Sequence, residues 1–588
     1  MKNFIIICLL IIACLLSSFL AHAQALYQGT VKDLKSLKGL PFAAIAIKNS
    51  AIGTLANEDG VFNIAAKMDD TLIIAQIGYE RKQIQMSSFV REPIVLLKLK
   101  DIQLDEVTVL ANNLDLYEVL EKSRDVLMAA NESASKVYFT LQTKSDKQNL
   151  ELVECYYNGY FDSNKIDNLV FKNGRIGLAA ANNQYFLNLN SSKVFVFLDL
   201  LHGNDHLPHS PFEYKKGRMK KLFILEKAPS GNDNFYLIKF LPKRKNDKLF
   251  SGEVYIDSKS YSIIKIYLKI ANTSFHPFLP LHKNVGEVSR VGIEVSKEFT
   301  EEANGYRLSH MTFNYRLTYR RLKNDPRNVG TDTLFDVYTQ GLMYFYDYGN
   351  LFYEPQFKYS GDFSDYQKIA LLTYNDNFWS INTGLVRSRE MQKAIMYFKN
   401  YGSLLNYSKS TSNEVFKKGI FEHSNIVWSG KQRLFVNINH IVPDTTQTYS
   451  FKKEYTEKNY DFRCQIFFDA NQCSDSIQYY SASIWDIYQS YYYGEASAIT
   501  NCFINIYFDL CEIERRKMDR LIHKNKFSIL QMDSLYRSTV TSLALIQDQY
   551  LEEVEKGNNL LALEKWNNYV YEKLNVDNFN LFSIVPKR

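Results

Sequence analysis

Three histidines fall within eight residues of the chain, at His202, His206 and His209. Imidazole nitrogens are common zinc ligands, so three of them at this spacing could hold a metal ion. Gly203 and Pro208 interrupt the segment and keep the three side chains from lining one face of a helix. The sequence therefore predicts a solvated loop and no metal site, with these histidines as the remaining candidate ligands.

Thiols are the second reactive group, and five cysteines lie beyond residue 23. If Cys502 and Cys511 share a helix, they stand about 13 Å apart along its axis, which is too far for a disulfide. Cys464 or Cys473 could pair with either of them in an oxidising compartment. The alternative is a set of buried thiols that includes Cys155. An odd number leaves at least one cysteine free or paired with another chain.

Intact catalytic motifs are absent from the sequence. It contains no G-x-S-x-G elbow, no G-x-x-x-x-G-K-[ST] phosphate loop and no G-x-G-x-x-G after a strand. The 64 acidic residues include no pair that stands out from solvated charge. Basic and acidic residues are interspersed and leave a net charge of +6 over 588 residues, which does not indicate nucleic-acid binding. We therefore predict no catalytic residue and no cofactor.

Residues 1–23 have the pattern of an export signal. Lys2 is the only charge before the apolar run 4–20, which ends in a small-x-small triplet at residues 21–23. The run also approaches the lower length limit of a membrane-spanning helix, and Cys14 lies in a loose lipid-attachment motif. The triplet favours cleavage. We therefore expect an exported protein, in the periplasm or at the periplasmic face of the outer membrane.

Short strands separated by turns follow at residues 24–112. Asp59-Gly60 between two apolar runs is a strong hairpin signal, because glycine accepts a positive φ. Strands at this spacing predict a β-sandwich of the Ig-like or transthyretin-like kind.

This region resembles the carboxypeptidase-regulatory-like domain of exported Bacteroidota proteins. The resemblance implies a location and an adaptor role, since the domain of that family is not catalytic. The matching residues are Gly29, Val31, Asp33, Pro41, Ala44, Ala46, Ile47, Gly53, Thr54, Asp59, Gly60, Phe62, Ile64, Gly78, Tyr79 and residues 104–109.

The middle of the chain is rich in strands. Apolar residues at helical spacing predict a connecting helix over residues 113–132. Residues 133–368 then alternate as antiparallel strands do, most clearly in a hairpin over residues 252–268. This hairpin resembles the half-barrel of lipoprotein-carrier-like proteins, which implies a concave apolar face for an acyl chain or a partner. The alternative, which we favour, is a curved antiparallel sheet with a filled core.

Residues 369–588 predict a mixed and then helical domain. The apolar spacing indicates a helix over residues 386–401, and strands are expected at residues 434–438 and 462–468. Three further helices are expected over residues 496–522, 528–554 and 560–574, with a break at residues 557–558.

This last region resembles a family of bacterial zinc peptidases whose first helix reads H-E-x-x-H-F-D-I-x-E. The two zinc histidines of that motif fall on Phe503 and Tyr507, the general-base glutamate on Ile504, and a later histidine on Lys556. Zinc hydrolysis needs imidazoles one helical turn apart and a carboxylate that activates water, so the resemblance implies a lost site. The positions that do match are Trp428, Ser429, Phe508, Asp509, Leu510, Glu512, Gln547, Tyr550, Glu553, Gly557 and Trp566.

These patterns predict a multidomain α+β protein: an N-terminal β-sandwich, a curved strand-rich middle domain, and a mixed and then helical C-terminal domain. The favoured function is non-enzymatic binding or scaffolding beside a cell-envelope protein partner, with peripheral membrane contact as an option and no nucleic acid. One alternative is a metal-dependent peptidase or hydrolase with ligands from His423, His440, His523 or the first histidine group. The other is a lipid or lipoprotein carrier.

Overall fold

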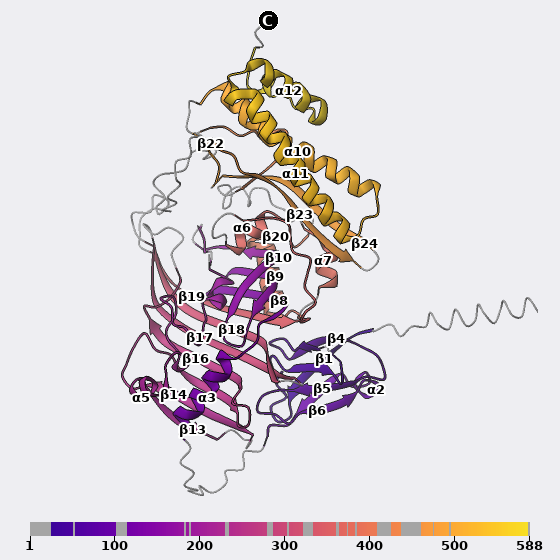
Figure 1. Cartoon of the computed structure of the whole chain (residues 1–588). Coiled ribbons are helices and arrows are strands. Elements are labelled where there is room, and N and C mark those ends of the chain that lie inside the picture. The colour runs from indigo at the N-terminus through magenta and orange to yellow at the C-terminus, as the bar shows by residue number, and fades with distance from the viewer. Residues whose placement is uncertain are drawn as a thin grey trace, which may run out of the picture.

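The computed structural model of the chain is shown in Figure 1. It describes residues 25–50, 53–100, 115–146, 148–181, 184–186, 188, 190–229, 234–278, 286–302, 305–321, 333–359, 364–372, 374–382, 385–408, 425–436, 460–473, 476–487, 489–492 and 496–585. Five sequence predictions lie outside these residues: the export signal, Cys14, the motif at residues 104–109, His423 and His440.

Two small sheets form the N-terminal domain, which confirms the predicted sandwich. Every second residue of β4 (Val61–Ala66) is buried, so this strand turns one apolar face inward. The turn before it requires glycine, because Gly60 has a φ of +79° and a Cβ there would lie 2.4 Å from the carbonyl oxygen of Val31. The other elements are β1 (Ala25–Asp33), β2 (Ala44–Ile47), β3 (Gly53–Leu55), β5 (Thr71–Ala75), β6 (Lys82–Gln85), α2 (Met86–Phe89) and β7 (Ile94–Leu97).

An open antiparallel sheet of eleven strands forms the middle of the molecule and curves across it in Figure 1. The predicted hairpin is present as β15 (Ser251–Asp257) and β16 (Ile263–Thr273). The other strands are β8 (Ser133–Ser145), β9 (Gln148–Phe161), β10 (Ile166–Leu178), β13 (Phe223–Ala228), β14 (Phe235–Pro242), β17 (Gly286–Glu302), β18 (Gly305–Arg321), β19 (Thr333–Tyr346) and β20 (Ser403–Leu405). Their order across the sheet is β13-β14-β15-β16-β17-β18-β19-β8-β9-β10-β20. A separate pair, β11 (Ala180–Ala181) and β12 (Gln184–Tyr185), follows β10 in the chain.

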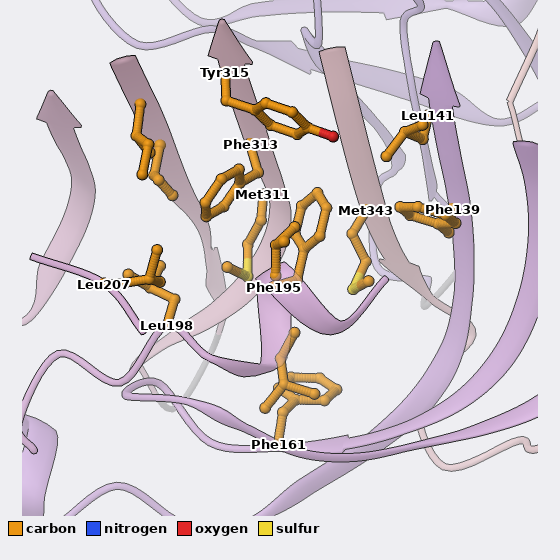
Figure 2. Packing of buried hydrophobic residues seen from close by; sticks show 14 of the residues in the cluster. Phe139, Leu141, Phe161, Phe195, Leu198, Leu207, Met311, Phe313, Tyr315 and Met343 are labelled. Carbon is orange, nitrogen blue, oxygen red and sulfur yellow. The ribbon is translucent and has the colours of Figure 1, made fainter. Parts of the chain in front are cut away.

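We call the face of this sheet that carries Phe139 and Phe313 the inner face. Residues 190–213, which we call the covering segment, pack on it through α4 (Lys193–Val196). In Figure 2 the ring of Phe195 points into this packing, 5.8 Å from the rings of both Phe139 and Phe313. Three further helices contribute buried residues to the same core: α3 (Leu116–Met128), where the connecting helix is predicted, α5 (Lys216–Leu222) and α6 (Asp365–Ala370). Protein side chains therefore fill the inner face.

The opposite, outer face of the sheet packs against the N-terminal domain. Leu55 of β3 shares a buried cluster with Tyr138 and Tyr344 of the sheet. Asp59 accepts a hydrogen bond from the backbone N–H of Arg389, at 2.6 Å, at the start of α8 (Arg389–Tyr401). This helix ends before Gly402, as predicted. The outer face also carries α7 (Asp376–Ile381).

The C-terminal region places helices on a small sheet. β21 (Asn425–Val427), β24 (Ser476–Asp486) and β23 (Cys464–Cys473) form this sheet, in that order. The predicted helices are present as α10 (Ala498–Lys524), α11 (Ile529–Val554) and α12 (Leu560–Leu574). The break predicted at residues 557–558 begins two residues earlier, because Glu555, Lys556 and Gly557 all have positive φ. The remaining elements are β22 (Tyr460–Asp461), β25 (Tyr491–Tyr492), α13 (Asn578–Leu581) and the 3-10 helices η1 (Pro211–Glu213) and η3 (Glu555–Gly557).

The strand predicted at residues 434–438 is wrong over its described part, because residues 434–436 form no strand. Side chains of α10 take the place of a neighbouring strand here. Asn505 accepts a hydrogen bond from the N–H of Leu434 at 2.9 Å and donates one to the same residue's carbonyl oxygen at 2.8 Å. Asn501 accepts a bond from the N–H of Val436. The backbone is therefore satisfied without a β ladder.

None of the helices in the described part of the chain combines the length and the apolar character of a membrane-spanning helix.

Candidate functional site

The first predicted site, the histidine group, does not converge in the structure. His202 lies 3.2 Å from Asp199 with its side chain 75% exposed, whereas the ring of His206 stacks on another residue, Phe197, at 4.3 Å. His209 is 2.7 Å from Glu213. Three separate partners thus hold the three imidazoles. Among the described residues, no group of three or more His, Cys, Asp and Glu side chains could hold a metal ion.

Buried polar groups instead fix the covering segment to the inner face. Asp365, at the start of α6, accepts hydrogen bonds from the backbone N–H and the hydroxyl of Ser192, each at 3.0 Å, and contacts the hydroxyl of Ser191. Tyr157 of β9 donates to the same carboxylate at 2.6 Å. The sheet, the covering segment and α6 therefore meet at one buried carboxylate.

Glu151 of β9 is a second buried carboxyl on this face. Thr143 donates a hydrogen bond to it at 2.6 Å, the backbone N–H of Asn188 donates another at 3.2 Å, and the hydroxyl of Tyr366 contacts it as well. Removal from water disfavours the charged form of a carboxyl more than these three donors favour it. Burial therefore raises the pKa of Glu151 to about 7.

The positions expected to have lost zinc ligands lie inside the C-terminal core. Phe503 and Ile504 are fully buried and Tyr507 is 8% exposed. The ring of Phe462 lies 5.5 Å from that of Phe503 and 5.3 Å from that of Tyr507. Tyr550 donates its hydroxyl to the carbonyl oxygen of Phe503 at 2.8 Å. Aromatic packing therefore occupies this part of α10.

Asp509, six residues further along α10, is buried in a closed hydrogen-bond network. Trp428 donates to it at 2.7 Å, Arg433 at 2.6 Å and Asn578 at 2.7 Å. Arg433 and Asp509 are 5% and 0% exposed, which makes this a buried ion pair. Its neighbour Glu512 accepts from three other side chains, those of Ser483, Arg515 and Arg516. The carboxylates of Asp509 and Glu512 therefore bind side chains of the protein itself.

An open cavity of about 650 Å³ lies beside the last turns of α10 and the end of α12. Asp519 is its one acidic lining residue, and Arg515 contacts that carboxylate. No carboxylate in the described part of the chain forms an ion pair with Arg520, Lys524 or Lys573. We call this cavity the cationic groove; its lining residues are Ile513, Arg516, Asp519, Arg520, His523, Lys524, Lys573 and Leu574.

Sequence reasoning missed the cationic groove, although a signal was present. Arg516, Arg520 and Lys524 recur at four-residue intervals and so share one face of a helix. Lys573 comes from a different helix, and only the fold brings it to the same place. His523, one of the alternative metal ligands, lines the groove and lies 2.8 Å from the hydroxyl of Tyr479.

Comparisons with known families match two parts of the chain. Residues 27–109 match the CarboxypepD_reg-like domain, which confirms the resemblance expected for the N-terminal region. Residues 223–320, from β13 to β18, match a family of unknown function (DUF5686). No curated protein matches the chain.

Comparisons with solved structures give only loose similarities over about two fifths of the chain. A LolA superfamily protein from Nitrosomonas europaea is 11% identical, with 39% of this chain and 93% of that chain covered and a TM-score of 0.16. The matching chain in the MucA/MucB complex of Pseudomonas aeruginosa is 9% identical, with 39% of this chain and 93% of that chain covered and a TM-score of 0.14. A DUF1329 family protein from Desulfovibrio piger is 9% identical, with 40% of this chain and 93% of that chain covered and a TM-score of 0.16. Scores this low support no inference about function.

Glu151 should make the stability of the folded chain depend on pH. Its pKa rises from the ordinary value of 4.5 to about 7 on folding, so its contribution is complete below pH 4.5 and is lost as pH rises through 7. We expect the free energy of unfolding to fall by about 3 kcal/mol over this interval, since one pKa unit is worth about 1.4 kcal/mol. Urea unfolding between pH 4.5 and 8 measures it.

The variant Glu151→Gln should remove this part of the pH dependence, because it cannot titrate. Glu80→Gln is the matched control, since Glu80 has a side chain 52% exposed and lies in the N-terminal domain. Equal slopes for the wild-type protein and Glu151→Gln would contradict the assignment.

Removal of one partner from the buried pair of Arg433 and Asp509 should cost far more than the same removal from an exposed pair. Asp509→Ala leaves the Arg433 guanidinium buried without its carboxylate, so we expect a loss of about 3–5 kcal/mol in the free energy of unfolding. Asp461→Ala removes the partner of Arg463, which is 56% exposed, and should cost about 0–1 kcal/mol. Chemical denaturation of the two variants provides the comparison, and similar losses would show that the Asp509 network is not a structural centre.

Proposed function

We propose that this chain is an exported, non-catalytic binding or scaffold protein of the cell envelope, as found in Bacteroidota. Three features support the proposal. The first 23 residues have the pattern of an export signal. Residues 27–109 match the CarboxypepD_reg-like domain, and the resemblance implies an exported protein in which this domain is not catalytic. The third feature, a contrast between two parts of α10, carries the functional part of the proposal.

The first half of α10 is closed to ligands. Phe503 and Tyr507, which fall where the peptidase motif has histidines, offer neither an imidazole nor a carboxylate to zinc and are packed against aromatic rings. The carboxylate of Asp509 is fully buried and bound by three donors of the protein itself. We propose that this domain derives from a zinc-peptidase-like ancestor and that its former site became core.

The second half of α10 is open and positively charged. Arg520, Lys524 and Lys573 extend into the cationic groove, where they remain available for a partner's charges. A concentration of one charge in a cavity attracts the opposite charge and raises the rate of encounter. We therefore propose that the groove binds an acidic segment of another cell-envelope protein.

The proposed units of the chain are a signal at residues 1–23, a sandwich at 24–112, a connecting helix at 113–132, a strand-rich domain at 133–368 and a mixed and then helical domain at 369–588. In this arrangement the N-terminal sandwich acts as an adaptor and the last domain presents the groove.

The two alternatives make different demands on the same structure. A lipid or lipoprotein carrier would have to displace the covering segment, whose Phe195 occupies the inner face; acyl chains in mass spectra of the purified protein would favour it. A metal-dependent hydrolase would need ligands from His423, His440, His523 or the histidine group at residues 202–209. Of these, His523 lines a groove dominated by cations. About one zinc ion per chain after dialysis against a weak chelator would favour that alternative.

Binding to an acidic peptide tests the proposal directly. We expect a fluorescent poly-glutamate peptide to bind the protein, and the double variant Arg520→Glu/Lys573→Glu to bind about tenfold more weakly or worse, since each close charge pair is worth of the order of 1 kcal/mol. Fluorescence anisotropy at about 0.1 M salt, where exposed charges beyond about 10 Å are screened, provides the measurement.

The matched control is Lys393→Glu/Lys399→Glu, which changes the net charge equally but alters exposed positions on α8. This control should keep the affinity of the wild-type protein. Equal weakening by both double variants would indicate an effect of net charge and would exclude the groove as the binding site.

A further inference from the structure

The cysteine pairing left open by the sequence has one geometrically favoured solution. Cys464 is the first residue of β23, and Cys511 lies near the middle of α10. Tyr507 of α10 donates a hydrogen bond to the carbonyl oxygen of Phe462, two residues before Cys464, at 3.5 Å. Burial raises the pKa of the Cys511 thiol, and the neighbouring Cys464 thiol raises it further. Gln547 of α11 donates a hydrogen bond to the sulfur of Cys464 at 3.0 Å, so this side chain points toward the helices.

The local register explains this approach. The rings of Phe462 and Tyr507 contact each other at 5.3 Å, where the chain enters β23 beside α10. Two residues further along an extended chain is an advance of about 7 Å, and four residues further along a helix is about 6 Å, in both cases on the same face. The next pair after Phe462 and Tyr507 is therefore Cys464 and Cys511.

The other three cysteines in the described part of the chain are placed for no such contact. Cys502 lies on the same helix as Cys511, about 13 Å further back along the axis. Cys473 is at the opposite end of β23 from Cys464, about 30 Å away along the strand. Cys155 is buried in the core of the large sheet. Among the described cysteines, Cys464 and Cys511 are therefore the pair that lies side by side where β23 packs against α10.

We propose that Cys464 and Cys511 form a disulfide that joins β23 to α10. Cys464 is partly exposed and Cys511 is fully buried, which sets the order of events. A small disulfide oxidant reacts with the Cys464 thiolate and releases one thiol, which gives a mixed disulfide on Cys464. The Cys511 sulfur then displaces the second thiol. The two cysteines lose two protons and two electrons, and one oxidant disulfide becomes two thiols.

The bond would close a loop that contains β23, β24 and the first half of α10. Such a crosslink restricts the unfolded chain and so raises the stability of the domain that also carries the cationic groove. Burial raises the pKa of the Cys511 thiol, so the second step should be faster at pH 8.5 than at pH 7. Formation of the bond in the cell rests on the proposed export, whereas its formation in the purified protein does not.

Oxidation of the folded, purified protein without residues 1–23 tests the inference. We treat it with oxidised glutathione, block remaining thiols with N-ethylmaleimide, and digest it without reduction. The five free thiols should fall to three, and mass spectrometry should find one linked peptide with Cys464 and Cys511. Its mass should be about 2 Da below that of the two reduced peptides, because two hydrogens are lost.

Three serine variants make the result specific. Cys464→Ser and Cys511→Ser should each lose the linked peptide and the rise in melting temperature that oxidation causes. Cys473→Ser, on the same strand, should retain both. No loss of thiols in the folded wild-type protein, or a linked peptide containing Cys155, Cys473 or Cys502, would overturn the proposal. A bond that forms in the purified protein but not in the periplasmic fraction would count against export alone.

Discussion

Strands β8, β9 and β19 of the eleven-stranded sheet carry buried apolar residues on both faces and have to be covered on both sides, and the arrangement of the neighbouring elements follows from this constraint. The inner face receives α3, the covering segment, α5 and α6. The outer face receives the N-terminal domain together with α7 and α8. The N-terminal domain and α3 precede the sheet in the sequence, the covering segment and α5 lie between β10 and β13, and α6, α7 and α8 lie between β19 and β20.

Buried charges fix how these covers are oriented. Glu154 on the outer face is fully buried and receives a two-point bond from Arg175 at 2.6 and 2.7 Å. Lys172 pairs with Asp469 at 2.6 Å and so attaches the large sheet to β23 of the C-terminal region. Such pairs add little to stability when compared with apolar packing, but a wrong arrangement would leave a charge buried without a partner. These pairs therefore act mainly by selecting one arrangement of the covering elements on the sheet. The hydrogen bonds of Asp365 do the same for the covering segment.

Features that depend on a few neighbouring residues could be predicted well from the sequence. The hairpin at Gly60 and the capped helices α10 and α11 follow from local turn chemistry and apolar spacing. Features that depend on distant partners could not. The backbone at residues 434–436 has the apolar character of a strand but is bound by Asn505 instead. Likewise, nothing near Glu151 in the sequence indicates that Tyr366 will bury it.

The position of β8 has a consequence for how the molecule is made. This strand is the first of the sheet to be synthesised, yet one of its neighbours is β19, the last strand of the long meander, with Leu141 opposite Gly341. This edge of β8 therefore cannot pair with β19 until about 200 further residues have been made, and a sheet with such distant pairing folds slowly. Until then both strands expose unpaired backbone and apolar surface, which is the state most prone to aggregation. Pairing of β8 with β19 thus comes only after the whole meander has been made, which places a demand for chaperoning on the newly made chain.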